Sequence, residues 1–295
     1  MYDIIIVGAG PAGLTSALYA RRAGKKVLVL EAKTYGGQII NTSSIENYPA
    51  LPNVSGFDFA TNLYNQVKAL DAEIKFETVI RIEEDKTVVT NKDKYQAKSI
   101  ILATGAENRK LNLDKEAELV GKGVSYCATC DGNFYKDKIV AVNGGGNTAL
   151  EDAIYLSNLA KKVYLIHRRD EFRGEQKYLE ELKKKDNVEF ILNANVIKLN
   201  GEDRLESIDI KQNDEVKTID IDGLFIAIGQ EPKNEIFANL INLNNGYIDS
   251  IDGVHTNADG IYVAGDTRVK ELRQLTTAVS DGAIAATTAI KEMED

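Results

Sequence analysis

The chain has 295 residues, of which 43% are hydrophobic and 27% charged, and its formal net charge is −9. This length and composition predict a globular chain of two domains, and the acidic balance argues against a nucleic-acid or anionic-membrane surface. No stretch is long and apolar enough to span a membrane, and the apolar run before Gly8 is too short for a signal peptide, so we expect a cytoplasmic protein.

The first predicted elements are a strand, a helix and a second strand. An apolar strand over residues 4–7 is followed by a helix over 12–22 and a buried strand over 26–31. The turn between the first strand and the helix reads Gly-x-Gly-x-x-Gly at 8–13, and Glu31 ends the second strand. In such a unit a pyrophosphate contacts the N–H groups at the start of the helix, and an acidic residue accepts hydrogen bonds from the ribose. We therefore predict a dinucleotide site here.

The next informative segment contains the only two cysteines, Cys127 and Cys130. A structural zinc site needs about four Cys or His ligands, and the only histidines are His167 and His255. Two inert core cysteines are another alternative, but the residues that flank the pair are too polar for a plain core strand. A CxxC pair can close into a disulfide and accept two electrons, so we predict a redox-active dithiol with Asp131 as the nearest candidate acid.

The strand-helix-strand pattern then repeats. A strand over 139–142, a helix over 148–159 and a strand over 163–167 surround Gly-x-Gly-x-x-Ala at 144–149. The spacing equals that of the first unit, so His167 is expected to occupy the place of the acidic residue there. This repeat predicts a second dinucleotide site.

A cluster of arginines, Arg168, Arg169 and Arg173, follows the last strand of the repeat. Guanidinium groups at this position can pair with a ribose 2′-phosphate through charge-assisted hydrogen bonds. The alternative is a solvated basic helix start, as charge runs usually are. The matched spacing favours NADP over NAD at this site.

Two further apolar strands, over 100–105 and 224–229, each end at a glycine and complete the repeat. The predicted fold class is therefore α/β, with two related nucleotide-binding domains, each built on a mainly parallel sheet with helical or antiparallel cover. The CxxC pair lies between the two fingerprints along the chain. This order indicates a redox relay from nicotinamide through flavin to disulfide.

Together these residues resemble the bacterial low-molecular-weight thioredoxin reductases over essentially the whole chain. The sequence CATC beside HRRxxxR is specific to that family, and Asn143 and Ser280 are among the few departures from its pattern. The matching segments are GAGPAG at 8–13, GGQ at 36–38, ENYP at 46–49, CATCDG at 127–132, GGGNTA at 144–149, HRRDEFR at 167–173, YVAGD at 262–266 and LRQ at 272–274.

The resemblance implies that both domains have a three-layer ββα, Rossmann-like fold and that the second is inserted in the first. The FAD-binding domain would comprise 1–112 and 243–295, and the NADPH-binding domain with the CxxC pair would comprise 113–242. The resemblance further implies a homodimeric enzyme that moves electrons from NADPH through FAD and the Cys127/Cys130 disulfide to oxidised thioredoxin. No metal is expected.

The same resemblance assigns roles to single residues. Cys130 faces the flavin, Cys127 attacks the partner disulfide, and Asp131 supplies or removes the proton. The implied FAD-binding residues are Gly8, Gly10, Pro11, Ala12, Gly13, Glu31, Gly37, Gln38, Asn47, Thr104, Gly105, Gly265, Asp266, Arg273 and Gln274. The implied NADPH-binding residues are Gly144, Gly146, Asn147, Thr148, His167, Arg168, Arg169 and Arg173.

Two alternative functions stay open. One is a related flavoprotein reductase that serves another carrier, either ferredoxin-linked or acting on the disulfide of a peroxidase subunit. The other is a nucleotide-binding redox sensor without enzymatic turnover, whose CxxC pair changes a partner surface.

The order of motifs also predicts motion. Nicotinamide and the dithiol must each reach the flavin, yet both belong to the inserted domain. We therefore expect that domain to rotate on linkers near 112–118 and 239–245.

Overall fold

The computed structural model describes residues 1–42, 44–51 and 53–294, and the chain divides into two compact units. The first unit comprises Met1–Glu107 and Glu231–Asp295, and the second comprises Asn108–Gln230. The second unit is therefore inserted in the first. The boundaries expected from the sequence, 112/113 and 242/243, lie later in the chain at both junctions.

The sheet of the first unit has a parallel and an antiparallel part that share β6 (Lys94–Leu102). The carboxyl-terminal half of β6 pairs in parallel with β1 (Tyr2–Val7) and β19 (Ile261–Val263). Its amino-terminal end pairs antiparallel with β5 (Thr87–Thr90). The sheet is completed by β2 (Val27–Glu31) and β3 (Glu73–Phe76) beyond β1, and by β4 (Val79–Ile82) beyond β5.

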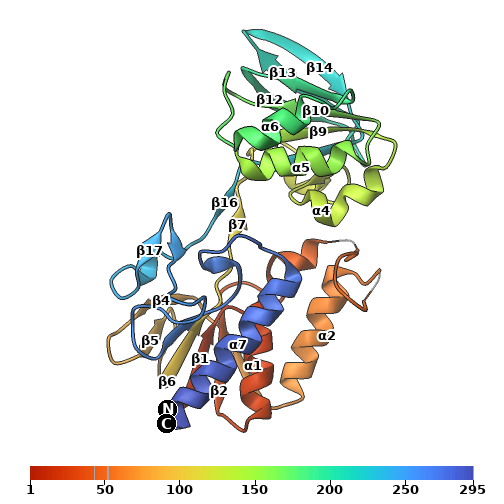
Figure 1. Ribbon diagram of the computed structural model, residues 1–295. Helices are drawn as coiled ribbons and strands as arrows, with labels where there is room; N and C mark the ends of the chain where they lie inside the picture. Colours follow the sequence, from red (N-terminus) through yellow and green to blue (C-terminus); the bar gives the residue numbers. More distant parts are fainter. Residues whose placement is uncertain (43, 52, 295) are drawn as a thin grey trace. The chain divides into compact units, whose positions relative to one another are not determined.

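Side chains of β1 alternate between two cores, as the two-residue period of a strand requires. Ile4 packs with apolar residues of α1 (Pro11–Arg22) and α7 (Leu275–Glu294), whereas Ile5 packs in the core on the opposite face. Figure 1 shows α1, α2 and α7 together on one face of this sheet. The remaining elements of the unit are α2 (Gly56–Lys68), η1 (Gly37–Asn41), η3 (Glu235–Phe237), η4 (Gly265–Thr267), β17 (Leu243–Asn244) and β18 (Tyr247–Ile248).

The second unit is built on five parallel strands in the order β11-β10-β9-β15-β8. Helix α5 packs on one face of this sheet, and an antiparallel sheet of β12, β13 and β14 belongs to the core on the other face. The strands are β8 (Val124–Ser125), β9 (Ile139–Gly144), β10 (Lys162–Ile166), β11 (Val188–Ile191), β12 (Ala194–Asn200), β13 (Ser207–Gln212), β14 (Glu215–Asp220) and β15 (Gly223–Ala227). The helices are α3 (Glu116–Leu119), α4 (Ala128–Asp131), α5 (Asn147–Ser157) and α6 (Gln176–Leu182), with the 3-10 turn η2 (Gly132–Tyr135).

The two units have corresponding strand orders, which confirms the predicted repeat and the α/β fold class. In the first, β3-β2-β1-β6 continues to β19, and in the second, β11-β10-β9-β15 continues to β8. Val7 pairs with Leu30, and Asn143 pairs with Ile166. Glu31 and His167 therefore follow equivalent positions, as the spacing predicts.

The chain passes between the units through two short strands, β7 (Glu107–Asn108) and β16 (Gln230–Glu231), which pair with each other. Beside them, the N–H of Arg109 donates a hydrogen bond to the carbonyl oxygen of Gly229 at 3.0 Å. The linkers expected near 112–118 and 239–245 lie inside the second and the first unit, respectively. In the part of the chain that the structure describes, no helix combines the length and hydropathy needed to cross a membrane.

Candidate active site

Cys127 and Cys130 follow β8 and are joined by a disulfide, with their Cα atoms 5.3 Å apart. Because β8 runs parallel to β15, and β15 to β9, the pair lies at the carboxyl-terminal edge of its sheet. The glycine-rich turn after β9 lies at the same edge, which is where ligands bind in parallel sheets. Both cysteines are partly exposed, as disulfide exchange with another protein requires.

Ser125 connects the dithiol to the candidate acid. Its side chain is buried, and Oγ donates a hydrogen bond to Oδ2 of Asp131 at 2.6 Å. The same Oγ accepts a hydrogen bond from the N–H of Cys127 at 3.0 Å. One hydroxyl group thus orients both the carboxylate of Asp131 and the backbone of the first cysteine.

Glu116 connects the dithiol to the segment that enters the second unit. It is only 3% exposed, and its carboxylate accepts hydrogen bonds from the N–H of Leu111 at 3.0 Å and of Leu113 at 3.2 Å. The hydroxyl of Tyr126 donates to the same carboxylate at 2.6 Å. Burial and then this hydrogen bond raise the pKa of Tyr126, so the phenol stays protonated and donates. Because Tyr126 immediately precedes Cys127, Glu116 restrains the backbone segment that leads into the disulfide.

The turn after β1 has the geometry that a dinucleotide needs. Gly8 has a φ of +109°, and a Cβ there would lie 2.3 Å from the carbonyl oxygen of Ala103. By contrast, a Cβ on Gly10, at the N-cap of α1, would meet no described atom within 4 Å. This open space lets a pyrophosphate approach the N–H groups of the helix. The other predicted residues of the turn, Pro11, Ala12 and Gly13, form the start of α1.

Glu31 ends β2 beside this turn. Its carboxylate accepts one hydrogen bond from the N–H of Ala9 at 2.8 Å and another from the N–H of Lys33 at 2.8 Å. These contacts fix the side chain next to the turn, at the position expected for a ribose ligand. Gly37 lies close by, since a Cβ on it would be 3.4 Å from the Cα of Gly10.

Asp266 lies in η4, directly after Gly265 and the strand β19. Its Oδ1 atom is buried and has no hydrogen-bond partner among residues 1–42, 44–51 and 53–294. Burial raises the pKa of Asp266, while Lys270 and Arg273 act in the opposite direction. An unsatisfied buried carboxylate oxygen costs free energy, and a ligand hydroxyl that donated to it would remove this cost.

The remaining residues predicted to bind flavin also belong to the first unit. Thr104 Oγ1 lies 2.7 Å from Oγ1 of Thr267 and donates to Oδ1 of Asn234 at 3.0 Å. The side-chain amide of Asn47 donates to Oε1 of Gln274 at 2.9 Å, which brings two predicted residues together. Gln38 donates to the carbonyl oxygen of Ala106, and Gly105, at a φ of +70°, lies between Ala106 and Thr104.

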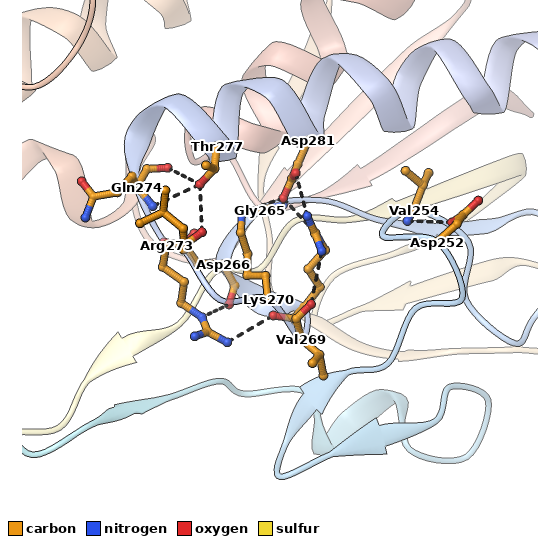
Figure 2. A network of polar contacts seen from close by, with 12 residues as sticks. Asp252, Val254, Gly265, Asp266, Val269, Lys270, Arg273, Gln274, Thr277 and Asp281 are labelled. Carbon is orange, nitrogen blue, oxygen red and sulfur yellow. Dashed lines mark hydrogen bonds and ion pairs between the residues drawn. The ribbon is translucent and has the colours of Figure 1, made fainter. Parts of the chain in front are cut away.

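Arg273 joins η4 to β18 within the same unit. Its guanidinium group lies over the ring of Tyr247, 4.1 Å from the ring centre, and its Nε donates to the carbonyl oxygen of Asp266 at 3.3 Å. Figure 2 shows Arg273, Asp266 and Gln274 around this turn. Arg273 therefore fixes the backbone on which Asp266 lies.

The turn after β9 repeats the geometry of the first turn. A Cβ on Gly144 would lie 2.3 Å from the carbonyl oxygen of Ala227, whereas one on Gly146 would meet no described atom within 4 Å. Asn147 and Thr148 begin α5, and Asn147 Oδ1 accepts a hydrogen bond from the N–H of Glu175 at 2.8 Å. The second fingerprint thus leaves a helix N-terminus open to a ligand in the same way.

His167 is buried and packs on the second turn. A Cβ on Gly145 would lie 2.1 Å from the imidazole, and the ring stacks on Phe172 with 5.0 Å between ring centres. Burial lowers the pKa of His167, and the neighbouring arginines lower it further, so the imidazole is neutral at pH 7. The ring therefore supports the turn as a neutral packing group.

The three arginines after β10 are exposed. Among the described residues, no ion pair or side-chain hydrogen bond involves the guanidinium groups of Arg168, Arg169 or Arg173. The backbone N–H of Arg173 donates to the carbonyl oxygen of Gly145 at 2.7 Å, which places this residue beside the second turn. The three side chains are thus available to a phosphate group near that turn.

The sequence profile of one enzyme family, "Pyridine nucleotide-disulphide oxidoreductase", matches residues 2–282. The chain belongs to this family. Its members include relatives similar along the whole chain. The thioredoxin reductase of Mycoplasma genitalium is 43% identical, over 97% of this chain and 93% of the relative, and that of Bacillus subtilis is 40% identical over the same shares. The crystal structure of thioredoxin reductase from Streptococcus pyogenes has a TM-score of 0.94 and 39% identity, covering 100% of this chain and 98% of that one.

Thioredoxin reductases of the pyridine nucleotide-disulphide oxidoreductase family use FAD and NADPH. The residues of this chain fit both groups. The buried, unsatisfied oxygen of Asp266 suits a hydroxyl of FAD, and the open helix N-terminus at Gly10 suits its pyrophosphate. The open turn at Gly146 suits NADPH, as do the three arginines, whose guanidinium groups have no partner among the described residues.

Several residues that support the predicted site residues through hydrogen bonds were not predicted from the sequence. Ser125 and Tyr126 had a visible signal, because polar residues next to a CxxC pair are unusual in a core strand. Glu116, Asn234 and Asp281 had none, because their partners lie elsewhere in the sequence. Asn234 contacts Thr104 and Thr267, and Asp281 contacts Gly265, Arg268 and Lys270.

Proposed function

We propose that this protein is an NADPH-dependent thioredoxin-disulfide reductase. The observation that carries the proposal is the Cys127–Cys130 disulfide, partly exposed at the carboxyl-terminal edge of a nucleotide-binding sheet. Its acid, Asp131, is oriented by Ser125. A second nucleotide-binding sheet in the same chain supplies the site for FAD.

FAD is bound by the first unit. The turn from Gly8 to Gly13 contacts the pyrophosphate, Glu31 accepts hydrogen bonds from the ribose, and Asp266 accepts one from a further hydroxyl. When bound, FAD supplies the two-electron chemistry between the NADPH hydride and the disulfide. The other residues assigned to this site are Gly37, Gln38, Asn47, Thr104, Gly105, Gly265, Arg273 and Gln274.

NADPH is bound by the second unit. The turn from Gly144 to Thr148 contacts its pyrophosphate, and Arg168, Arg169 and Arg173 pair with the 2′-phosphate. The preference for NADPH over NADH rests on these guanidinium groups, because NADH has no phosphate for them to bind. His167 packs under the turn and keeps its shape.

The two cysteines have different tasks. Once two electrons have broken the disulfide, the Cys127 thiolate attacks one sulfur of oxidised thioredoxin and displaces the other as a thiolate, which takes up a proton. The Cys130 thiolate then attacks the Cys127 sulfur. This step restores the Cys127–Cys130 disulfide and releases, as a thiolate, the thioredoxin sulfur that was bonded to Cys127. Asp131 supplies or removes the proton at the dithiol.

Two broader properties belong to the same proposal. The protein acts as a homodimer in the cytoplasm, where a catalytic CxxC pair is kept reducible. Its second unit rotates relative to the first, because nicotinamide and dithiol both lie on that unit and must each reach the flavin. The proposed hinge residues are 107–108 and 230–231, where the chain passes from one unit to the other.

The proposal is tested by an assay of the purified protein with thioredoxin, comparing NADPH, NADH and reduced ferredoxin as electron donors. We expect a yellow flavin spectrum and turnover with NADPH well above turnover with NADH. Cys130→Ser should trap a mixed disulfide between Cys127 and thioredoxin, whereas Cys127→Ser should trap none. Turnover that required ferredoxin, or flavin reduction by NADPH without any reduction of thioredoxin, would contradict the proposal.

A further inference from the structure

Asp281 of α7 is a buried carboxylate with an unusually complete set of donors. Its side chain is 9% exposed, and its Oδ2 accepts hydrogen bonds from the N–H of Gly265 at 3.0 Å, Nε of Arg268 at 2.9 Å and Nζ of Lys270 at 2.8 Å. Oδ1 accepts another from Nη2 of Arg268 at 3.0 Å. Figure 2 shows Asp281 on the helix together with Gly265 and Lys270 of the segment that follows β19.

Asp281 pairs with two cations, Arg268 and Lys270, inside the protein. Burial acts to raise the pKa of Asp281, but the hydrogen bonds from Arg268 and Lys270 outweigh it and bring the pKa below its ordinary value. Asp281 is therefore ionised, and Lys270, whose side chain is only 6% exposed, depends on it for charge neutralisation. Removing one member of such a buried pair leaves the other charge uncompensated, which is strongly destabilising.

Asp281 lies where α7 and α1 pack closely. A Cβ on the next residue, Gly282, would lie 2.2 Å from the carbonyl oxygen of Ala12, and Ser16 Oγ donates to the carbonyl oxygen of Gly282 at 2.9 Å. Gly265, which donates to Asp281, also lies against α1, since a Cβ on it would be 2.8 Å from the Cβ of Ala12. The start of α1, the turn at Gly265 and Asp281 thus share one packing site.

The turn fixed in this way holds the unsatisfied carboxylate of Asp266. Gly265 has a φ of +81°, and its N–H is fixed by Asp281, so the direction of the Asp266 side chain depends on that contact. Asp281 itself is satisfied by protein donors, whereas Oδ1 of Asp266 has no hydrogen-bond partner within the described ranges. The two carboxylates have different tasks: Asp266 is available to a ligand, and Asp281 supports it.

We infer that Asp281, with Arg268 and Lys270, is a positioning residue for FAD: it holds Gly265 against α1 and so sets the carboxylate of Asp266 for the flavin hydroxyl. This inference rests on the proposed assignment of Asp266 to FAD. Asp281 touches neither cofactor nor substrate. Its effect on the flavin passes through the backbone of the turn.

The test is the affinity of folded apoprotein for FAD, measured by quenching of flavin fluorescence during titration. Asp281→Asn keeps the shape and an acceptor for Gly265 but removes the charge, so we expect FAD to bind at least about tenfold more weakly. Asp281→Asn/Lys270→Met removes both charges of the pair and should recover part of the loss. Asp252→Asn is the matched control, because Asp252 fixes another loop of the same unit by accepting from the N–H groups of Val254 and His255.

Thermal unfolding of each apoprotein separates positioning from stability. A lowered melting temperature with unchanged FAD affinity in Asp281→Asn would overturn the inference, as would equal weakening by Asp252→Asn. Should Asp281→Asn not fold, Arg268→Lys decides by the same titration: weaker FAD binding supports the inference and unchanged binding overturns it. Asp266→Ala with unchanged FAD affinity would instead refute the proposed flavin site, whereas loss of affinity in Asp266→Ala alone would refute only the role of Asp281.

Discussion

At the scale of single residues, we propose that cofactor choice depends on three guanidinium groups that have no ion pair or side-chain hydrogen bond with another described residue. Arg168, Arg169 and Arg173 are exposed near the second glycine turn, and His167 beside them is buried and neutral. A hydrogen bond to a charged group contributes about 1.5–3 kcal/mol. Two such contacts would therefore separate NADPH from NADH by about two to four orders of magnitude.

The double variant Arg168→Ala/Arg169→Ala should bring the two nucleotides close to parity in kcat/KM, mainly through a higher KM for NADPH. Steady-state kinetics with both nucleotides measures this. Lys183→Ala/Lys184→Ala is the matched control, because it removes two positive charges from the exposed end of α6 in the same unit. An unchanged ratio in the arginine variant, or an equal change in the lysine variant, would refute the role of the cluster.

At the scale of elements, Gly8 and Gly10 of the first turn have opposite surroundings. Gly8→Ala places a methyl group against the carbonyl oxygen of Ala103 at positive φ, so we expect a marked loss of stability. Gly10→Ala places a methyl group in open space, so the apoprotein should keep its melting temperature while its affinity for FAD falls. Calorimetry of the apoproteins and FAD titration measure the two effects. Equal melting temperatures for both variants would show that the turn is not constrained as described.

The end of α7 provides a pH-dependent contact in the first unit. Both ring nitrogens of His255 lie 2.7 Å from carboxylate oxygens, of Glu292 on α7 and of Asp252, and Tyr262 donates to Glu292 at 2.6 Å. The hydrogen bonds that His255 donates to Glu292 and then to Asp252 raise its pKa above the ordinary value, whereas the pKa of Asp252 falls to about 2. The imidazolium therefore stabilises the folded state below the unfolded pKa, and this contribution is lost as pH rises through the folded pKa.

His255→Gln should accordingly lower the melting temperature most at mildly acidic pH, above the range in which Asp252 is protonated, and least above the folded pKa of His255. Melting curves of wild type and variant across this range provide the measurement. A difference that grew with rising pH would contradict the sign of this linkage.

Local signals explain which elements could be predicted. Both strand-helix-strand units were predicted because apolar strands and glycine turns lie next to each other in the sequence, and their observed ends differ by at most two residues from the predicted ones. The contacts of Glu116 and Asp281 could not be predicted, because no sequence pattern indicates which distant donors surround a buried carboxylate. The segment 231–242 was expected in the inserted domain, because no sequence pattern indicates that Asn234 contacts Thr104 and Thr267. These contacts join the segment to the first unit.

At the scale of the whole molecule, the proposed rotation predicts that neither fixed arrangement of the two units supports turnover. Cross-links that tie the units in either arrangement should each preserve at most one half-reaction, either flavin reduction by NADPH or reduction of the dithiol. Stopped-flow absorbance resolves the two steps, and cleavage of the cross-link should restore both. A permanently linked enzyme that reduced thioredoxin at the unlinked rate would show that no rotation is needed.

In the proposed reaction, electrons from NADPH reach the Cys127–Cys130 disulfide. The most direct test mixes the FAD-loaded protein with NADPH without oxygen, quenches it with an alkylating agent and determines by mass spectrometry which cysteines are modified. We predict that both cysteines become alkylated after NADPH, that neither does without a nucleotide, and that NADH is much less effective. A disulfide that stayed closed while NADPH bleached the flavin would contradict the claim.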